Sequence, residues 1–325
     1  MRLIDADAVA RTLDPLTLVE ALRSAHQTGE MGEVERLLIE RQGTPNSALV
    51  WAAWRPGLGV AVKTATVFPE NSLSGSWPNI HSVVTLFDAA HGEPLAVIHG
   101  ESFTRMKTAG DSALACDLLA ARDAATLAVL GAGGQAETHV RFLSAVRPSL
   151  RRIVVWNRTP HKAERLAAAL RDKGADAEAS VSAEAAVRQA AIVTCLTAAT
   201  EPVLHGAWLR AGAHVDLVGG FTPRMRESDD EVLRRARLFA DTLRFTVETC
   251  GDYANPVARG AVVGDLFDLC SGRVQGRRGP EEITVFKNGG GGHLDLIIAR
   301  TMWDLCRDHD EVRRVGVETS RFGSK

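Results

Sequence analysis

The order of apolar and polar positions predicts that the N-terminal third of the chain is a helix followed mainly by strands. The segment LTLVEALRSAHQTG repeats apolar residues at helical spacing and ends at Gly29, so residues 1–30 should form a short strand and an amphipathic helix. From Val34 to Phe87, turn clusters RPGLG and PENSLSGSWPN separate β-prone runs. The expected strands are LLIERQ, ALVWAAW, GVAVKTATVF and IHSVVTLFDA.

The middle of the chain has a different pattern, in which predicted strands and helices alternate. A helix is expected at residues 112–121, and residues 125–130 (ATLAVL) form a short buried strand followed by GAGGQA and a helix. A second strand, RRIVVWNR, and further alternating segments follow: HKAERLAAALRDKG, AIVTCLTAAT and AHVDLVGG. This alternation predicts α/β architecture with a doubly wound parallel sheet. We assign residues 119–295 to it, and residues 1–118 plus 296–325 to a second domain, to which the late helix LDLIIARTMWDLCRD returns.

Composition narrows the class of protein. The 325 residues are 45% hydrophobic and 24% charged, with a net charge of −2, so no basic excess favours nucleic acid as a partner. The start MRLIDADAVART does not resemble a signal peptide, and no apolar run has the length of a membrane span. The five scattered cysteines lack a CxxC pair, which favours reduced thiols over a disulfide framework or a zinc site. We expect a cytoplasmic protein without a metal.

The segment GAGGQA is a candidate dinucleotide-binding loop. Gly131, Gly133 and Ala136 have G-x-G-x-x-G/A spacing between a strand and a helix, and Gly134 and Gln135 complete the loop. The glycines would permit a tight turn and close approach of a pyrophosphate to amides at the helix N-terminus. The alternative is a glycine-rich turn without a ligand.

The end of the second strand selects between dinucleotides. An acidic residue usually binds the ribose 2′-hydroxyl of NAD at this place. This chain has Asn157, Arg158, Thr159 and Lys162 instead, and an arginine with small donors suits a 2′-phosphate. NADP(H) is therefore the preferred cofactor and NAD(H) the second choice, unless Arg158 is only a solvated charge.

Five further positions are candidate cofactor contacts. Thr197 lies at the carboxyl end of a predicted strand, as do Val218 and Gly219, where ligands of α/β sheets bind. Thr108 is expected at a helix start, and either threonine could instead cap a helix. His293 follows the run NGGGG, which either lets backbone approach the nicotinamide or leads into a helix.

Lys63 stands inside the apolar, β-prone run GVAVKTATVFPEN. Desolvating a lysine is costly unless it meets an anion or loses its proton. Lys63 is thus a candidate for pairing with a substrate carboxylate and exchanging a proton. The alternative is a strand-edge lysine whose ammonium reaches solvent.

Several segments together resemble the ornithine cyclodeaminase/mu-crystallin family. They are GVAVKTATVFPEN, FDAAHGEPLAVIHGESFTRMKTAGDSALACDLLA, LAVLGAGGQAETH, DLVGGFTPRMRE and EITVFKNGGGGHLDLIIA, in matching order along nearly the whole chain. The resemblance implies a Rossmann domain inserted into an α+β substrate-binding and dimerisation domain. It also implies a homodimer that acts on small α-amino or α-imino acids with NAD(P).

The same resemblance implies roles for individual residues. Lys63 matches an active-site lysine near the substrate carboxylate that is a proposed proton carrier. The family's Arg-Thr-Ala begins here with Lys107, which keeps the positive charge but loses the bidentate fork. An early-strand arginine usually assists with the substrate, and Arg36 is the preferred match, with Arg41 in reserve. His81 matches a substrate-facing region, although a structural histidine is an equal alternative.

A second departure from the family bears on the reaction. Ornithine cyclodeaminases have an aspartate directly after the Gly-Gly of this strand, where the chain has Phe221, and Asp229 and Asp230 lie too far along to replace it. We therefore expect NADPH-dependent reduction of a cyclic α-imino acid, Δ1-pyrroline-2-carboxylate or Δ1-piperideine-2-carboxylate, to the L-amino acid. The alternatives are an amino-acid dehydrogenase or reductive aminase, a cyclodeaminase, and a non-catalytic NADPH-binding protein of the crystallin kind.

Overall fold

The computed structural model describes residues 1–71 and 77–307 and the backbone of residues 313–314. The chain forms two compact units. The first contains Met1–Asp14, Met31–Thr104 and the segment from Gly291 onward, and the second contains Pro15–Glu30 and Arg105–Gly290. Residues 15–30 belong to the second unit because their helix packs against helices of that unit. The sequence-based boundaries at residues 118 and 295 stay a prediction.

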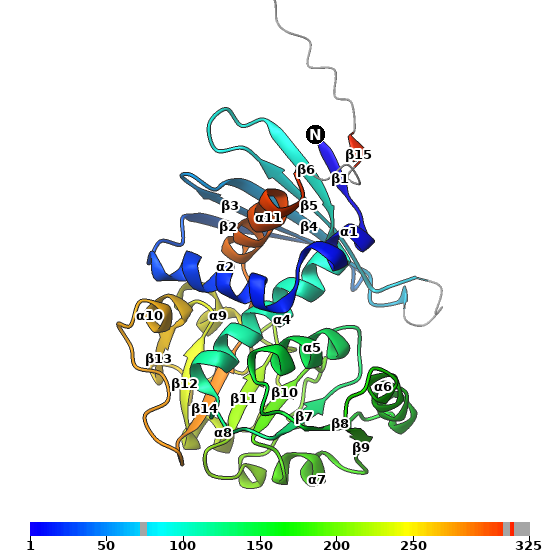
Figure 1. The fold of residues 1–325 in the computed structure, drawn as a ribbon, viewed down its shortest axis with the longest axis vertical. Coiled ribbons are helices and arrows are strands. Elements are labelled where there is room, and N and C mark those ends of the chain that lie inside the picture. The colour runs from blue at the N-terminus through cyan, green and yellow to red at the C-terminus, as the bar shows by residue number, and fades with distance from the viewer. Residues whose placement is uncertain (72–76, 308–312, 315–325) are drawn as a thin grey trace, which may run out of the picture. The chain divides into compact units, whose positions relative to one another are not determined.

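The first unit is built on a mostly antiparallel sheet (Figure 1). Within the described residues its strand order is β15-β1-β6-β5-β4-β3-β2. Strand β1 is parallel to β6, and each strand from β2 to β5 is antiparallel to the next strand in the sequence. The strands are β1 (Arg2–Ile4), β2 (Glu33–Glu40), β3 (Ser47–Arg55), β4 (Gly59–Val67), β5 (Ile80–Phe87), β6 (Pro94–His99) and β15 (Arg313–Arg314). Its helices are α1 (Ala6–Thr12) and α11 (Gly292–Cys306).

The two faces of this sheet differ in environment. On β4 every second residue from Gly59 to Ala65 is buried, because α11 packs on that face against β3, β4 and β5. The opposite face exposes large apolar side chains, with exposed fractions of 55% for Leu37, 54% for Ile39, 60% for Trp54 and 38% for Val83. A large apolar surface of this kind is typical of a contact face.

The second unit is a parallel sheet with helices in its connections (Figure 1). Its strand order is β13-β12-β14-β11-β10-β7-β8-β9. The strands are β7 (Thr126–Leu130), β8 (Arg152–Trp156), β9 (Ala177–Ala179), β10 (Ile192–Cys195), β11 (His214–Leu217), β12 (Ala236–Ala240), β13 (Val262–Asp265) and β14 (Ile283–Lys287). The helices are α2 (Pro15–Gln27), α4 (Gly100–Leu119, which starts in the first unit), α5 (Ala136–Val146), α6 (Pro160–Asp172), α7 (Ala183–Arg188), η1 (Gly206–Trp208), α8 (Asp230–Arg235), α9 (Leu243–Thr249) and α10 (Leu266–Cys270).

Both faces of the parallel sheet are covered. Leu127 and Val129 of β7 join an apolar cluster with residues of α5 and α6, whereas Ala128 and Leu130 join a second cluster on the other face. The strand order reverses direction between β7 and β10, which defines the switch point where ligands of such sheets bind.

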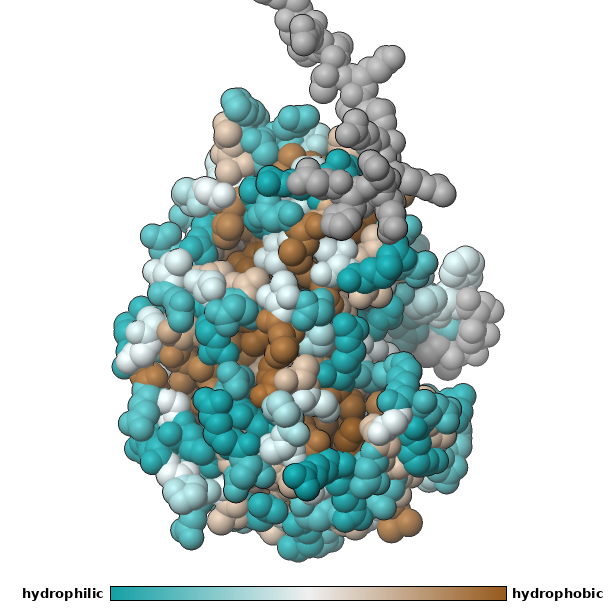
Figure 2. Space-filling model, viewed as in Figure 1, coloured by the Kyte–Doolittle hydropathy of each residue, from teal (hydrophilic) through white to brown (hydrophobic). Residues whose placement is uncertain are grey.

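Polar side chains cover most of the molecular face drawn in Figure 2.

Helix α4 differs from its sequence prediction. The predicted helix at residues 112–121 is only the second half of a 20-residue helix that begins at Gly100. Thr108 is therefore inside the helix and not at its start. Polar residues such as Ser102, Lys107, Asp111 and Ser112 are buried on α4, so its apolar periodicity is weak. Within residues 1–71 and 77–307, no helix has both the length and the hydropathy needed to cross a membrane.

Candidate cofactor and substrate sites

The glycine loop lies at the carboxyl end of β7. Gly131 has a φ of 116°, and its N–H donates to the carbonyl of Trp156 at 2.8 Å, which joins the loop to the end of β8. A Cβ added at Gly131 would lie 2.6 Å from the carbonyl oxygen of Leu196. Glycine is required here both by the backbone conformation and by the close approach of the loop after β10.

The rest of the loop suits an anionic ligand. A Cβ added at Gly133 or Gly134 would meet no atom within 4 Å, so open space adjoins the backbone before α5. Gln135 precedes the helix without a side-chain cap, and its buried Oε1 accepts no hydrogen bond from the described residues. Ala136 begins α5 and is fully buried in the core. The residues present therefore fit a dinucleotide pyrophosphate at a helix N-terminus.

The end of β8 braces this loop. The Asn157 side chain accepts from the Ala132 N–H at 3.1 Å and donates to the Thr159 carbonyl at 3.1 Å. Arg158 and Lys162 beside it are exposed, and neither forms an ion pair within the described part of the chain. Asn157 thus acts on the shape of the loop, while the two cations are available to a charged ligand.

The loops after β10 and β11 meet at a buried carboxylate that sequence analysis did not identify. Glu227 Oε1 accepts from the Thr197 N–H at 2.7 Å and from Thr197 Oγ1 at 2.8 Å. Glu227 Oε2 accepts from the Gly219 N–H at 2.7 Å. The preceding Val218 is held by its own N–H, which donates to the Cys195 carbonyl at 3.0 Å. Burial raises the pKa of Glu227 to about 7, and Lys287 opposes that rise.

A second buried network joins α4 to the parallel sheet. Asp216 of β11 accepts from Ser112 Oγ at 2.9 Å and from Thr194 Oγ1 at 2.7 Å. The side-chain amide of Asn288 donates to the Thr108 carbonyl and to Ser112 Oγ, each at 3.0 Å. Burial raises the pKa of Asp216 to about 6. Thr108, a predicted cofactor contact, is thus fixed through its backbone by the segment after β14.

Lys107 lies in a buried part of α4. It is 4% exposed, and a Cβ added at Gly290 would lie 3.7 Å from its Nζ. Asp111, one helical turn later, is fully buried, and burial together with nearby Asp241 raises its pKa well above the usual range. The charge of Lys107 opposes that rise. The structure therefore places Lys107 among buried acidic groups of the second unit.

Lys63 of β4 has a carboxylate partner within the first unit. Its Nζ lies 3.9 Å from Oδ1 of Asp295, which is in the first turn of α11 and 1% exposed. Lys63 is itself 8% exposed, so it does not extend into solvent like a strand-edge lysine. Asp295 is not predicted from the sequence as a site residue, and its local signal is an acidic side chain in the first turn of a predicted helix.

Register brings Arg36 onto the same sheet face as Lys63. Arg36 of β2 pairs with Trp51 of β3, which pairs with Lys63 of β4, and directly paired residues share a face. The Arg36 guanidinium carbon lies 5.6 Å from the Trp51 ring centroid. Its buried Nε donates no hydrogen bond to the described residues. Arg41 instead lies beyond β2, where its N–H donates to the Asn46 carbonyl in the turn.

The two candidate histidines lie in different surroundings. His81 of β5 pairs with Thr66, which is three residues from Lys63 on β4 and therefore on the opposite face. His81 Nδ1 is 3.0 Å from Glu101 Oε1. His293 is the second residue of α11 and is 1% exposed. The structure does not bring His81 to the face that holds Lys63.

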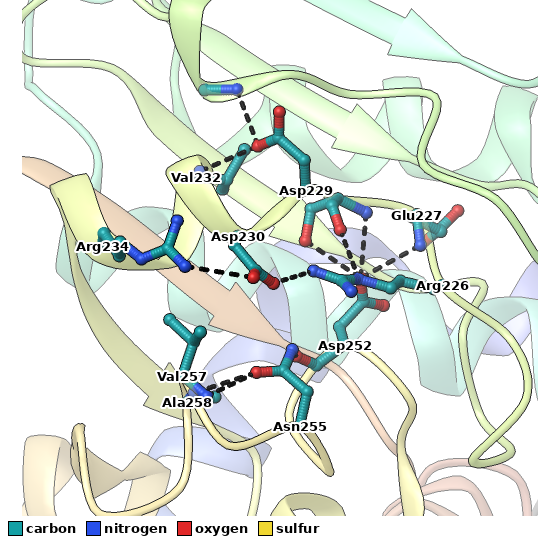
Figure 3. Close-up of polar contacts among 12 residues, drawn as sticks. Arg226, Glu227, Asp229, Asp230, Val232, Arg234, Asp252, Asn255, Val257 and Ala258 are labelled. Atoms are coloured by element: carbon teal, nitrogen blue, oxygen red, sulfur yellow. Dashed lines mark hydrogen bonds and ion pairs between the residues drawn. The ribbon is translucent and has the colours of Figure 1, made fainter.

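The aspartates near Phe221 have structural roles. Asp229 caps α8 by accepting from the Val232 N–H at 3.0 Å, and Asp230 pairs with Arg226 and Arg234 (Figure 3). Phe221 itself is 42% exposed. Neither aspartate replaces the acidic group that Phe221 lacks.

Comparisons with known proteins extend over both units. The model of the ornithine cyclodeaminase/mu-crystallin family matches residues 52–310. The Delta(1)-pyrroline-2-carboxylate reductase of Paracoccus denitrificans is 42% identical over 286 residues, which are 86% of this chain and 89% of that protein. The ketimine reductase mu-crystallin of Mus musculus is 33% identical over 237 residues, 73% of each chain.

A solved structure has the same fold. It is the Thermococcus litoralis Delta(1)-pyrroline-2-carboxylate reductase in complex with NADH and L-proline. Its TM-score is 0.91 at 27% identity, and the match covers 97% of this chain and 100% of the other. The predicted fold class, a Rossmann-type parallel sheet with an additional sheet domain, is confirmed.

Proposed function

Because this chain belongs to the ornithine cyclodeaminase/mu-crystallin family, we propose that it reduces a cyclic α-imino acid to the L-amino acid with NADPH. The chain is an oxidoreductase that uses a nicotinamide cofactor. Δ1-Pyrroline-2-carboxylate is the preferred substrate because two similar proteins are named for its reduction. Δ1-Piperideine-2-carboxylate differs by one ring methylene, which an apolar pocket discriminates weakly.

The observation that carries the proposal is the pairing of Lys63 with Asp295 on a buried sheet face. Lys63 would bind the substrate carboxylate, since a lysine ammonium carries three donors and forms strong charge-assisted hydrogen bonds with carboxylates. Arg36, two strands away on the same face, has a buried guanidinium Nε that suits the same anion. Lys107 is proposed as a further carboxylate-binding residue on the family resemblance alone.

Lys63 and Asp295 would also manage the single proton of the reaction. A ring nitrogen that carries a proton makes the C=N carbon electrophilic, and a lysine beside a carboxylate can hold that proton or return it. When bound, the nicotinamide cofactor supplies the hydride. Binding and orientation provide much of the remaining rate enhancement. Phe221 cannot act as a base, which disfavours deamination of a diamino acid.

The preference for NADPH rests on Arg158 and Lys162. Both are exposed at the end of β8, near the loop that Asn157 braces, and no described carboxylate neutralises them. A 2′-phosphate would find two cations there, whereas the ribose hydroxyls of NADH would find no acidic acceptor. We accordingly propose tighter binding of NADPH than of NADH.

We also propose that the protein is a homodimer in the cytoplasm. Leu37, Ile39, Trp54 and Val83 form an exposed apolar patch on the sheet face opposite α11, called here the outer sheet face. A second copy covering this face would remove these side chains from water.

One experiment tests the proposed reaction. Oxidation of NADPH would be followed with Δ1-pyrroline-2-carboxylate, with Δ1-piperideine-2-carboxylate, and with pyruvate plus ammonia in parallel. Turnover on a cyclic imine alone is expected, and the faster ring gives the preference. Turnover only with the oxo acid and ammonia would make the protein a reductive aminase. Cofactor binding without any turnover would favour a non-catalytic crystallin-like protein.

A further inference from the structure

We propose that Glu227 is a positioning residue of the cofactor site, whose carboxylate fixes the two backbone loops that adjoin the nicotinamide half of the dinucleotide. The inference rests on the proposed function in assuming that a nicotinamide dinucleotide binds at the switch point of the parallel sheet. The glycine loop and the β8 end would hold the adenosine and pyrophosphate part. The other half then lies along the ends of β10 and β11, where Thr197 and Gly219 are located.

The geometry shows that Glu227 joins these two loops directly. Its Oε1 accepts two hydrogen bonds from Thr197 and its Oε2 accepts one from the Gly219 N–H, all between 2.7 and 2.8 Å. The loops are also in close contact, since a Cβ added at Gly219 would lie 1.7 Å from the Thr197 carbonyl oxygen. One side chain therefore sets the separation of the two loops. Glu227 itself belongs to no strand of the sheet.

A second carboxylate holds Glu227 in place. Asp252 Oδ1 accepts from the N–H groups of Glu227 and Ser228 and from Ser228 Oγ, each at 3.0 Å. Figure 3 shows the Asp252 carboxylate pointing at this backbone segment. Asp252 Oδ2 lies 3.3 Å from Nζ of Lys287, and both side chains are fully buried. The support thus passes from β14 through Asp252 to Glu227 and then to the two loops.

The charge of Glu227 matters because three groups donate hydrogen bonds to its carboxylate, and only the ionised carboxylate offers acceptors alone. Burial raises its pKa to about 7, with Lys287 of β14 lowering it and Asp252, from the loop after α9, raising it. Cys195 of β10 is a further titratable neighbour, and its own pKa is raised well above the usual range, so it stays neutral. Protonation of Glu227 near neutral pH would replace one acceptor lone pair with a donor and loosen the junction.

The test compares Glu227→Gln with Asp229→Asn by the dissociation constant for NADH, read from nicotinamide fluorescence. NADH avoids titration of a 2′-phosphate, whose second pKa is about 6. Glutamine keeps the shape but presents an N–H₂ to one of the backbone donors. We expect about tenfold weaker NADH binding for Glu227→Gln. Asp229→Asn alters a helix cap in the same loop and should leave the dissociation constant unchanged.

A second readout separates positioning from general stability. In the wild type, NADH binding should strengthen as the pH rises from about 6 to about 8, and Glu227→Gln should remove that dependence. If Glu227→Gln does not fold, Thr197→Val, which deletes the Oγ1 hydroxyl that donates to Glu227 and accepts from the Ala199 N–H, should still weaken binding. Equal NADH affinity for all the folded variants, or a wild-type affinity independent of pH, would overturn the proposal. Failure of imine reduction alone would overturn only the proposed reaction, because NADH binding is measured without substrate.

Discussion

The Nζ of Lys63 lies 3.9 Å from Oδ1 of Asp295, although the two residues come from β4 and from the helix near the end of the chain. Both side chains are almost fully buried on one face of the antiparallel sheet. A lysine in an apolar strand therefore has an internal anion before any substrate arrives. The separation is longer than a hydrogen bond, so the contact is an ion pair between two buried side chains.

Lys63→Met is expected to lower kcat/KM for the cyclic imine by about a hundredfold or more. The substitution removes the ammonium that would bind the substrate carboxylate and carry the proton. The dissociation constant for NADPH should stay the same. Lys173→Met, which alters an exposed lysine paired with Glu137, is the matched control. Steady-state kinetics of both variants check this, and a Lys63→Met enzyme with most of its kcat/KM would exclude the assigned role.

Asp295→Asn is expected to lower kcat/KM by about tenfold, because Lys63 loses the charge that holds it. Added to Lys63→Met, it should cause little additional loss, since residues that act as a unit are not additive. A double-mutant cycle on kcat/KM measures this. Full additivity of the two effects would show that Asp295 acts independently of Lys63.

Arg158→Ala is expected to weaken NADPH binding by about tenfold or more and to leave NADH binding nearly unchanged, because only NADPH carries the 2′-phosphate. Arg165→Ala removes an exposed arginine of α6 and serves as the control. The dissociation constants of both variants for NADPH and for NADH test this prediction. An equal change for NADPH and NADH would mean that Arg158 does not recognise the phosphate.

Asp216→Asn should change how stability depends on pH. Burial raises the pKa of Asp216 from 3.8 to about 6, so the folded state holds the proton more tightly than the unfolded state. Protonated Asp216 makes its full contribution to the free energy of unfolding below about pH 4. This contribution is lost as the pH rises to about 6, a difference on the order of 3 kcal/mol. Urea unfolding across this range should show a smaller decline for Asp216→Asn than for wild type. Parallel curves would contradict the raised pKa.

Leu37→Glu should weaken a dimer that uses the outer sheet face, since it buries a charge in an apolar contact. Leu37 is 55% exposed in the single chain. Val181→Glu, at a residue that is 99% exposed in the other unit, is the control. Light scattering coupled to size-exclusion chromatography would show a shift toward monomer for Leu37→Glu only. A monomeric wild type would contradict the dimer proposal directly.

Local sequence patterns predicted the parallel sheet and its glycine loop correctly, because strand burial, turn chemistry and helix starts depend on near neighbours. Helix α4 was predicted at half its length, since buried polar residues such as Lys107 and Asp111 conceal its apolar face. Strands β6, β9, β12 to β14 and β15 were not predicted. They are short, and their place in a sheet depends on partners distant in sequence.

The sequence by itself determined the βαβ unit, the need for glycine at position 131 and the unusual presence of a lysine in an apolar strand. These features depend on backbone conformation and on the cost of desolvating one charge. Only the tertiary structure decided which groups meet that charge and hold the loops. Asp295 faces Lys63, Arg36 shares its face and Glu227 joins Thr197 to Gly219, because strand register and helix packing bring together residues that no local pattern relates.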